Sequence, residues 1–416
     1  MKTLKGIIEI PSDKSISHRA VIFSSLAKGK SVIKNFSLAQ DPISSLEFCK
    51  NLGVDIQQNG STLIINSNGN FNPLKNIFNC GNSGTTMRLM SGILAGQNFN
   101  STLIGDESLS SRPMKRIIQP LSLMGAKINS SDNHAPLLIS GSELHGIDYC
   151  SKISSAQVKS CVLLAGLFAD GNTIYTEPYL SRNHTELMLT SMDADIKIFN
   201  NTVSIKKSEL NPINMEICGD ISSASYFIAG AIITPNSDII LKNVGLNPTR
   251  SGILEVLKKM GGDIKILDKK YICNELVGDL RIKYSPHLKG CEISGEIIPK
   301  LIDEIPIIAL IASQADGQTI IKDAYDLRNK ESDRIKTTVA ELKKLRVDIK
   351  ETTDGMVIEG KSELIGGVET DSHKDHRLAM TLYVANLITK KEISIHDFDW
   401  VKISFPNFVE LFESLY

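Results

Sequence analysis

The sequence predicts an α/β protein of two lobes, and three observations lead to this fold class. Segments rich in Ala, Gly, Ser and Leu alternate with short segments rich in Val and Ile, which is typical of helices alternating with strands. The alternation recurs six times, with a period of about 70 residues. Because a chain of 416 residues exceeds the usual size of one core, we expect three repeats in each lobe.

Each repeat opens with a polar loop and continues with a helix whose small and apolar residues lie on all sides, as in a buried helix. A β-branched segment, a second polar loop, an amphipathic helix and a closing strand follow. The first three copies include a helix at 20–27, a strand at 31–34 and a helix ending at 52–54, then loops opening at 81–85 and 154–157.

The last three copies begin near 219–224, 303–304 and 374–377. The boundary between the lobes is expected near 218–220. We therefore assign residues 12–218 to an N-terminal lobe and residues 1–11 with 219–416 to a C-terminal lobe.

The charge balance excludes several classes of function. The net charge is −1, whereas proteins that bind nucleic acid or anionic membranes usually carry a basic excess. No stretch approaches the ~20 apolar residues of a membrane span, and the first twenty residues contain charges where a signal peptide is apolar. We expect a cytoplasmic monomer that binds neither nucleic acid nor a membrane.

The seven cysteines are scattered, and no two form a C-x-x-C pair. This pattern argues against a disulfide framework and a structural zinc site, and favours free thiols. His373 and His376 lack a third ligand at helical spacing, so we expect no metal.

Charged and hydroxyl residues gather where helices are expected to begin, and exposed N–H groups make such ends suitable for anions. Lys14 and Arg19 flank the first start, and they reach one site only if Lys14 precedes the helix and Arg19 lies in its first turn. Ser15 or Ser17 could instead simply cap this helix. Similar groups occur at 81–88, 111–113, 154–157, 303–304, 330–334 and 375–377.

Seven cations at these starts come from both halves of the chain, beside the acids Asp303 and Glu331. Solvated charges would not recur at the same place in a repeat, so the pattern predicts binding of small, multiply charged anions. The cations are Lys14, Arg19, Arg88, Arg112, Lys330, Arg334 and Arg377.

In these segments the chain resembles the EPSP synthase family, the 3-phosphoshikimate 1-carboxyvinyltransferases, over essentially its whole length. The resemblance implies a two-lobed inside-out α/β barrel, with three βαβαββ units per lobe around buried parallel helices. The matching segments are 13–19, 81–88, 112–114, 155–160, 219–224, 330–334, 375–380 and 404–406.

The resemblance also implies the activity: transfer of the enolpyruvyl group of phosphoenolpyruvate to the 5-hydroxyl of shikimate 3-phosphate, without a cofactor. It implies Asp303 as the base, and Glu331 or Lys14 as the acid at the methylene carbon. Shikimate 3-phosphate would be held by Ser15, Arg19, Ser155, Gln157 and Arg182. Phosphoenolpyruvate would be held by Gly84, Arg112, Lys330, Arg334 and Arg377, with Asn82 and Thr85 shaping its pocket and Lys14 contacting both substrates.

Three positions depart from some family members. Asp326 replaces an Asn, and Lys402 lies one residue out of register with a Lys, so we leave both out of the site. Gly84 stands where herbicide-tolerant members carry Ala, which implies sensitivity to glyphosate.

Three other functions fit the sequence less well. The sister transferase that acts on UDP-N-acetylglucosamine has a Lys-Asn first motif and a reactive Cys in its mobile loop, whereas this chain has Lys14-Ser15 and no Cys in 105–112. A catalytically inactive binding module would be expected to lose Asp303 and Glu331. A nucleic-acid clamp would need a basic excess and interleaved aromatic residues.

Overall fold

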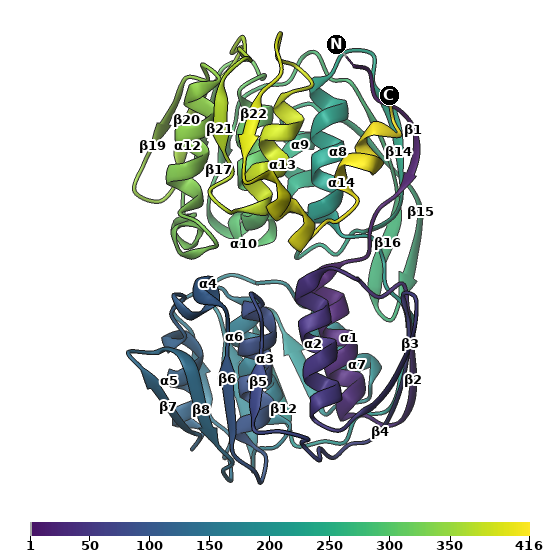
Figure 1. Cartoon of the computed structure of the whole chain (residues 1–416), viewed down its shortest axis with the longest axis vertical. Coiled ribbons are helices and arrows are strands. Elements are labelled where there is room, and N and C mark those ends of the chain that lie inside the picture. Colours follow the sequence, from purple (N-terminus) through teal and green to yellow (C-terminus); the bar gives the residue numbers. More distant parts are fainter. Residues whose placement is uncertain (1) are drawn as a thin grey trace. The chain divides into compact units, whose positions relative to one another are not determined.

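Helices alternate with strands along the chain, as the repeat predicts, and the strands form six small sheets in the computed structural model, which describes residues 2–416 (Figure 1). Five of these sheets have four strands and the last has two. The mixed α/β fold class is therefore confirmed.

Each complete repeat has more strands than the sequence pattern indicated. In the second repeat, β5 (Ile77–Asn79) runs parallel to β6 (Ser101–Ile104), while β7 (Lys127–Ser131) and β8 (His134–Ser140) form an antiparallel hairpin beside β6. The order is strand, helix, strand, then a short helix and a longer one, then two strands. The opening strand was missed because it is only three residues long.

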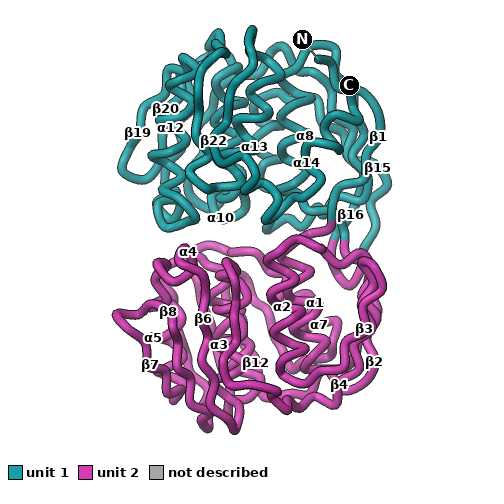
Figure 2. The backbone as a smooth tube through the Cα atoms, viewed as in Figure 1, with its two compact units in different colours: residues 1–11, 218–271, 276–416 teal, residues 12–217, 272–275 magenta. Residues whose placement is uncertain are grey.

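The chain divides into two groups of elements, shown in different colours in Figure 2. Unit 1 contains residues 1–11, 218–271 and 276–416, and unit 2 contains residues 12–217 and 272–275. The sequence placed 272–275 in the C-terminal lobe. These residues instead pack with unit 2, where Glu275 contacts Nδ1 of the buried His184 at 2.6 Å.

Unit 2 holds three of the sheets. Their strand orders are β13-β2-β4-β3, β5-β6-β8-β7 and β11-β12-β10-β9. The remaining strands of unit 2 are β2 (Lys28–Lys34), β3 (Asp55–Asn59), β4 (Thr62–Asn68), β9 (Asp148–Cys150), β10 (Asn172–Thr176), β11 (Ile196–Phe199), β12 (Thr202–Lys206) and β13 (Asn214–Glu216). Its helices are α1 (Lys14–Leu26), α2 (Gln40–Asn51), α3 (Gly84–Ala95), α4 (Glu107–Ser110), α5 (Lys115–Leu123), α6 (Ala156–Gly166) and α7 (His184–Ser191).

Unit 1 holds the other three sheets, with orders β1-β14-β16-β15, β17-β18-β20-β19 and β21-β22. The strands are β1 (Lys5–Glu9), β14 (Asp238–Gly245), β15 (Asp263–Ile272), β16 (Glu275–Lys283), β17 (Glu292–Ile293), β18 (Gln318–Ile321), β19 (Ile349–Glu351), β20 (Met356–Glu359), β21 (Glu369–Asp371) and β22 (Ser394–His396). The helices are α8 (Ile221–Ile233), α9 (Gly252–Lys259), α10 (Ile298–Leu301), α11 (Ile305–Ala312), α12 (Arg334–Lys344), α13 (His376–Ala385) and α14 (Phe408–Glu413), with short 3₁₀ turns at Gly295–Ile297, Ile302–Glu304, Tyr325–Asn329 and Phe398–Ile403.

The first helix of each repeat is buried on nearly all sides, as its small residues predict. Small residues matter because they let helix backbones approach closely. At Gly92 in α3, an added Cβ would lie only 2.1 Å from the carbonyl oxygen of Cys161 in α6. Any side chain at position 92 would therefore push these two core helices apart.

Two strands come from distant parts of the chain. β1, at the N-terminus, pairs in parallel with β14 of unit 1. β13, at the end of unit 2, pairs in parallel with β2 near its beginning. Each strand thus completes a four-stranded sheet whose other members lie elsewhere in the sequence.

Aromatic residues close the core of unit 1 at its C-terminal end. Phe405 packs against Phe227 of α8, with ring centroids 6.0 Å apart, and against Phe408 at 5.3 Å. Phe412 stacks on Phe227 at 4.5 Å. The Ser-Phe-Pro segment at 404–406 therefore contributes to packing through its Phe. Among residues 2–416, no helix is long and apolar enough to cross a membrane.

Candidate functional site

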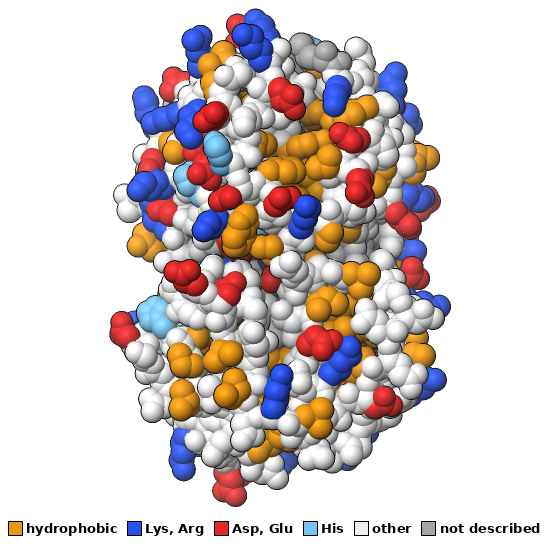
Figure 3. All heavy atoms as spheres, viewed as in Figure 1, with side chains coloured by type: hydrophobic (Ala, Val, Ile, Leu, Met, Phe, Trp, Pro, Cys, Tyr) orange, Lys and Arg blue, Asp and Glu red, His pale blue; other side chains and the backbone are white. Residues whose placement is uncertain are grey.

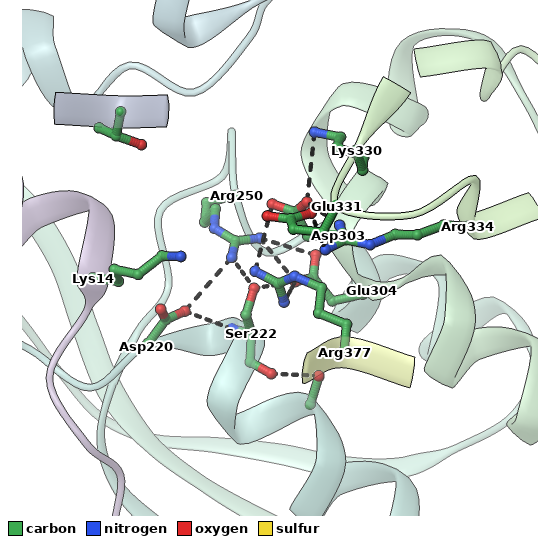
Figure 4. A network of polar contacts seen from close by, with 12 residues as sticks. Lys14, Asp220, Ser222, Arg250, Asp303, Glu304, Lys330, Glu331, Arg334 and Arg377 are labelled. Atoms are coloured by element: carbon green, nitrogen blue, oxygen red, sulfur yellow. Dashed lines mark hydrogen bonds and ion pairs between the residues drawn. The ribbon is translucent and has the colours of Figure 1, made fainter. Parts of the chain in front are cut away.

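The starts of several helices meet in unit 1, with polar side chains between them (Figure 4). Ser222, the second residue of α8, donates to Glu304, which directly precedes α11. Arg334, the first residue of α12, binds Asp375, the N-cap of α13. Helix N-termini carry partial positive charge, so their convergence favours anions at this end of the unit.

Arg334 is the centre of the unit 1 cluster and has 1% of its surface exposed. Its Nε donates to Asp375 Oδ2 at 2.7 Å, Nη1 to Asp303 Oδ1 at 3.2 Å, and Nη2 to Glu331. Burial acts to lower the pKa of Arg334, but the charges of Asp375 and Glu331 outweigh it and hold this pKa above its usual value. Its guanidinium is thus a fixed positive charge.

Asp303 faces three cations. Besides the contact with Arg334, its carboxylate lies 3.6 Å from Lys330 Nζ and 3.7 Å from Arg377 Nη2. Opposite charges favour the ionised form of a carboxyl group. Burial acts to lower the pKa of Arg377, but the charge of Asp303, followed by those of Tyr226 and Glu304, raises it well above the usual value.

A second buried pair lies beside Asp303. Arg250 Nη1 binds both carboxylate oxygens of Glu304, at 3.0 and 2.9 Å, and Arg250 Nη2 lies 3.5 Å from Asp220. Arg377 Nη1 is 3.9 Å from Glu304. The guanidinium of Arg377 therefore contacts both of the neighbouring acids, Asp303 and Glu304, and fixes the turn that precedes α11.

In unit 2 the starts of α1, α6 and α7 meet at Arg19, whose side chain is buried. Its Nε donates to Thr185 Oγ1 at 2.7 Å and its Nη2 to Ser160 Oγ at 2.9 Å. Burial lowers the pKa of Arg19 to about 10, while the negative charges of Glu186 and Asp13 act in the opposite direction. Arg19 remains charged at neutral pH.

The starts of α3 and α6 also lie together. Gln157 donates to Thr85 Oγ1 at 3.0 Å and accepts from Arg88 Nη1 at 2.7 Å. Ser155 is the N-cap of α6 and accepts from the N–H of Val158. An amide and hydroxyls at paired helix starts can donate hydrogen bonds to an anionic ligand.

Arg112 is held against the loop that opens α3. Its Nη2 donates to Asn82 Oδ1 at 2.7 Å and to Ser108 Oγ at 3.0 Å, while Asn82 Nδ2 donates to Asp106 at 2.7 Å. Lys14 Nζ lies 2.9 Å from Asp41 Oδ2. The amide of Asn82 and the carboxylate of Asp41 thus contact these two cations.

Comparison with known proteins identifies the family of this chain. The model of the family described as EPSP synthase (3-phosphoshikimate 1-carboxyvinyltransferase) matches residues 1–412. The chain belongs to the EPSP synthase family.

Relatives and solved structures match over nearly the whole length of this chain and of their own. A 3-phosphoshikimate 1-carboxyvinyltransferase of Thermodesulfovibrio yellowstonii is 54% identical, with 100% of this chain and 98% of the relative covered. The Bacillus subtilis protein of the same name is 49% identical, with 99% and 97% covered. An EPSP synthase structure from Acinetobacter baumannii matches with a TM-score of 0.89 and 40% identity, covering 100% of this chain and 96% of that one. The enolpyruvyl transferase NikO of Streptomyces tendae shares the fold, with a TM-score of 0.80 at 15% identity.

The structure brings the predicted residues of unit 1 into one cluster, whereas those of unit 2 lie in separate sets of contacts. The unit 1 cluster joins Asp303, Lys330, Glu331, Arg334 and Arg377 through direct contacts. In unit 2, contacts join Arg19 to α6 and α7, Gln157 to Thr85, and Arg112 to Asn82. Asp326 and Lys402, left out of the prediction, contact Lys330 at 3.5 Å and Asp399 at 2.7 Å respectively.

The start of α1 differs from the prediction. Asp13 caps the helix by accepting from the N–H of Ile16 at 2.8 Å, so neither Ser15 nor Ser17 is the N-cap. The helix consequently begins at Lys14 itself and Arg19 falls in the second turn. The condition under which Lys14 and Arg19 would reach one site, with Lys14 before the helix and Arg19 in its first turn, is therefore not met.

Sequence reasoning missed two sets of buried residues that contact the clusters. Arg250 follows Pro248-Thr249 with no local signal, and its partner Glu304 was read only as an acid near a helix start. Lys159 lies inside 155–160, one of the segments that resemble the family, but the sequence pattern indicated no role for it. Its two acidic partners lie 18 and 27 residues farther along the chain, a spacing that no helix or strand period would link.

Proposed function

We propose that this protein transfers the enolpyruvyl group of phosphoenolpyruvate to the 5-hydroxyl of shikimate 3-phosphate and releases phosphate. Membership of the EPSP synthase family supports the reaction. The observation that carries it is the cluster of three cations, Lys330, Arg334 and Arg377, around the single carboxylate of Asp303. This cluster combines anion binding with a group able to accept a proton.

The chemistry requires an addition followed by an elimination. The 5-hydroxyl oxygen bonds to C2 of phosphoenolpyruvate and loses its proton, while C3 gains a proton and becomes a methyl group. The bond from C2 to the phosphate oxygen then breaks, and the methyl group returns a proton. Enol ether and inorganic phosphate are the products, and no step requires a metal or an organic cofactor.

Each step has a candidate residue. Asp303 accepts the hydroxyl proton, and Glu331 or Lys14 protonates the methylene carbon. Lys330, Arg334 and Arg377 stabilise the negative charge of the intermediate and of the departing phosphate. The two candidates for the acid at the methylene carbon differ in kind and place. Glu331 is a carboxyl group of unit 1 that contacts Arg334, and Lys14 is an amine of unit 2.

The residues proposed to bind substrate form two sets, one for each substrate. The set proposed for shikimate 3-phosphate lies wholly in unit 2: Ser15, Arg19, Ser155, Gln157 and Arg182. The set proposed for phosphoenolpyruvate comprises Gly84 and Arg112 of unit 2 and Lys330, Arg334 and Arg377 of unit 1, with Asn82 and Thr85 beside it and Lys14 touching both substrates.

The remaining properties follow from the same proposal. We place the protein in the cytoplasm as a monomer, without nucleic-acid or membrane partners. In Figure 3, Lys and Arg side chains alternate with Asp and Glu over the visible face, and no broad basic field covers it.

Release of inorganic phosphate from the two substrates together tests the proposal. We expect phosphate and an enol ether product, identified by its vinyl proton signals, only when both substrates are present. Binding of both substrates without any phosphate release would identify an inactive binding module instead. Activity with UDP-N-acetylglucosamine in place of shikimate 3-phosphate would favour the sister transferase.

A further inference from the structure

A fully buried charged triad lies in unit 2 and has no part in the reaction as proposed. Lys159 of α6, Glu177 after β10 and Glu186 of α7 are each at most 1% exposed. Lys159 Nζ lies 2.7 Å from Glu177 Oε1 and 2.7 Å from Glu186 Oε1. Burying charges costs free energy, and such groups destabilise a core unless partners compensate closely. The triad therefore points to a role beyond stability.

The first two members of the triad close a five-residue turn. Glu177 Oε1 accepts from Ser181 N at 2.8 Å and from Ser181 Oγ at 3.0 Å, and Lys159 Nζ donates to Ser181 O at 3.2 Å. The backbone of Glu177 is held in turn by Asn201. Both ends of the turn are thereby fixed, and the next residue is Arg182, the proposed ligand of the sugar phosphate.

The same turn is tied to the start of α6. The N–H of Tyr179 donates to Ser154 Oγ at 2.9 Å, directly before the N-cap Ser155. Lys159 lies one helical turn below, where its N–H donates to Ser155 O at 3.0 Å. Lys159 therefore connects the helix that carries Ser155 to the turn that carries Arg182.

The third member of the triad stands beside Arg19. Glu186 follows Thr185, which accepts from Arg19 Nε, and Ser160, which also accepts from Arg19, follows Lys159. Burial lowers the pKa of Arg19, and among the charges that oppose this shift, that of Glu186 has the largest effect. The four groups comprise two cations and two anions, so Arg19 and the triad together form a charge-balanced set.

We propose that the triad Lys159–Glu177–Glu186 positions the two arginines, Arg19 and Arg182, that bind the phosphate-bearing acceptor. The inference rests on the proposed function for the identity of that acceptor. The triad members are positioning residues. Lys159 and Glu177 act through Ser181 on Arg182. Lys159 and Glu186 join α6 to α7, the helices whose Ser160 and Thr185 accept from Arg19. None of them touches phosphoenolpyruvate.

Steady-state kinetics of Lys159→Met test the proposal. We expect the KM for shikimate 3-phosphate to rise at least about tenfold, because misplacing a charged ligand removes a charge-assisted hydrogen bond. The KM for phosphoenolpyruvate and kcat should change less than about threefold. Val162→Ala, a buried truncation on the same helix, is the control: it should lower the unfolding temperature and leave both KM values in place. A parallel rise of both KM values in Lys159→Met would overturn the proposal.

A double-mutant cycle isolates the path through Arg182. Glu177→Gln keeps the shape of the side chain, so it also serves if Lys159→Met fails to fold, and alone it should show the same split between the two KM values. In an Arg182→Ala background, Glu177→Gln should add less than about twofold, because residues that act in series are not additive. Full multiplication of the two effects would exclude a path through Arg182.

A measurement without substrate separates this inference from the proposed function. Amide hydrogen exchange of residues 178–183 in the ligand-free protein should be faster in Lys159→Met than in wild type and Val162→Ala. Unchanged exchange would contradict the positioning role. If the wild type binds shikimate 3-phosphate but forms no product, the proposed function fails, while exchange and calorimetric binding still decide the inference.

Discussion

At the scale of single residues, Asp303 occupies the most constrained position. Lys330, Arg334 and Arg377 all lie within 3.7 Å of its carboxylate, and Arg334 is itself fixed by Asp375. A carboxylate surrounded in this way cannot move to avoid a neighbouring substrate. Its geometry suits a base that meets a hydroxyl group in one orientation.

Replacing this carboxylate with an amide should abolish most turnover. We expect Asp303→Asn to lower kcat by about 10²–10⁴-fold, the usual contribution of a general base. Phosphate release under saturating substrates measures the effect. Asp316→Asn, an exposed acid of the same unit paired with Lys361, is the control and should keep wild-type kcat. Equal activity of the two variants would remove Asp303 from the mechanism.

Lys14 should affect turnover far more than affinity for the sugar phosphate. We expect Lys14→Ala to lower kcat by at least about 100-fold, because the lost charge stabilises the transition state. The dissociation constant of shikimate 3-phosphate, from calorimetry, should rise less than about fivefold, since the other proposed ligands remain. Lys28→Ala, which removes an exposed ion pair with Glu209, provides the control. The opposite ranking would make Lys14 a simple anion ligand.

Gly84 should determine the response to glyphosate. We expect millimolar glyphosate to inhibit the wild type, and Gly84→Ala to weaken inhibition and raise the KM for phosphoenolpyruvate. The physical reason is steric: a Cβ at Gly84 would lie 2.6 Å from Arg88 Nη1, which donates to Gln157. The end of the Arg88 side chain would have to shift, which would disturb its hydrogen bond to Gln157. Inhibition curves for both proteins test this, and wild-type turnover untouched by millimolar glyphosate would contradict it.

At the scale of elements, a chain of hydroxyl groups connects three helices of unit 2. His18 Nδ1 of α1 lies 2.7 Å from Ser45 Oγ of α2, which lies 2.7 Å from Thr86 Oγ1 of α3, which donates to Ser83. His18 is fully buried. Burial lowers its pKa to about 3, despite the opposing charge of Asp41.

This histidine should make stability depend on pH. The folded pKa, about 3, is below the usual 6.5, so the unfolded chain binds the proton more readily. The contribution of neutral His18 to the free energy of unfolding is therefore complete above about pH 6.5 and falls as the pH drops toward 3. The loss amounts to about 2 kcal/mol by pH 5. His18→Asn, whose amide replaces Nδ1, should show a shallower loss. Urea unfolding at pH 7 and pH 5 measures the free energy of unfolding of both proteins. An equal loss of this free energy between the two pH values in wild type and His18→Asn would contradict the prediction.

The elements also show what local sequence could and could not predict. The buried helices were predictable because small and apolar residues on every side, as in α3 and α11, leave no polar face for solvent. The location of the polar clusters was predictable because their residues recur at helix starts. The N-cap at Asp13 was missed because Ser15 and Ser17 offered equally good local caps. The Arg250–Glu304 pair depends on tertiary packing across 54 residues, which no local pattern records.

At the scale of the whole molecule, the two units carry different parts of the proposed chemistry. All five residues proposed for shikimate 3-phosphate lie in unit 2, whereas Asp303 and its cations lie in unit 1. The family resemblance supplied this division from the order of motifs alone. It could not supply the position of 272–275, because the hairpin of β15 and β16 carries a short tip that packs with the other unit.

Hydrogen exchange with one substrate at a time should reveal this division. We expect shikimate 3-phosphate alone to protect amides at the starts of α1, α6 and α7, because ligand binding stabilises the segments that it contacts. Amides at the starts of α12 and α13 should change less. Inorganic phosphate at equal concentration is the control for general anion effects. Protection that begins in unit 1 would reverse the assignment of the two substrate sets.

β1 and β13 each pair with a strand that lies far away in the sequence, so their sheets close at different times during synthesis. β13 reaches its partner β2 once residue 216 has been made, so the sheets of unit 2 can close early. β1 ends at residue 9, yet its partner β14 begins at residue 238, and a ribosome adding about 5–20 residues per second needs roughly 11–46 s to make the residues between them. During this interval β1 has no sheet to join. It is thus an unpaired strand, available to chaperones or to a neighbouring nascent chain, until β14 has been made.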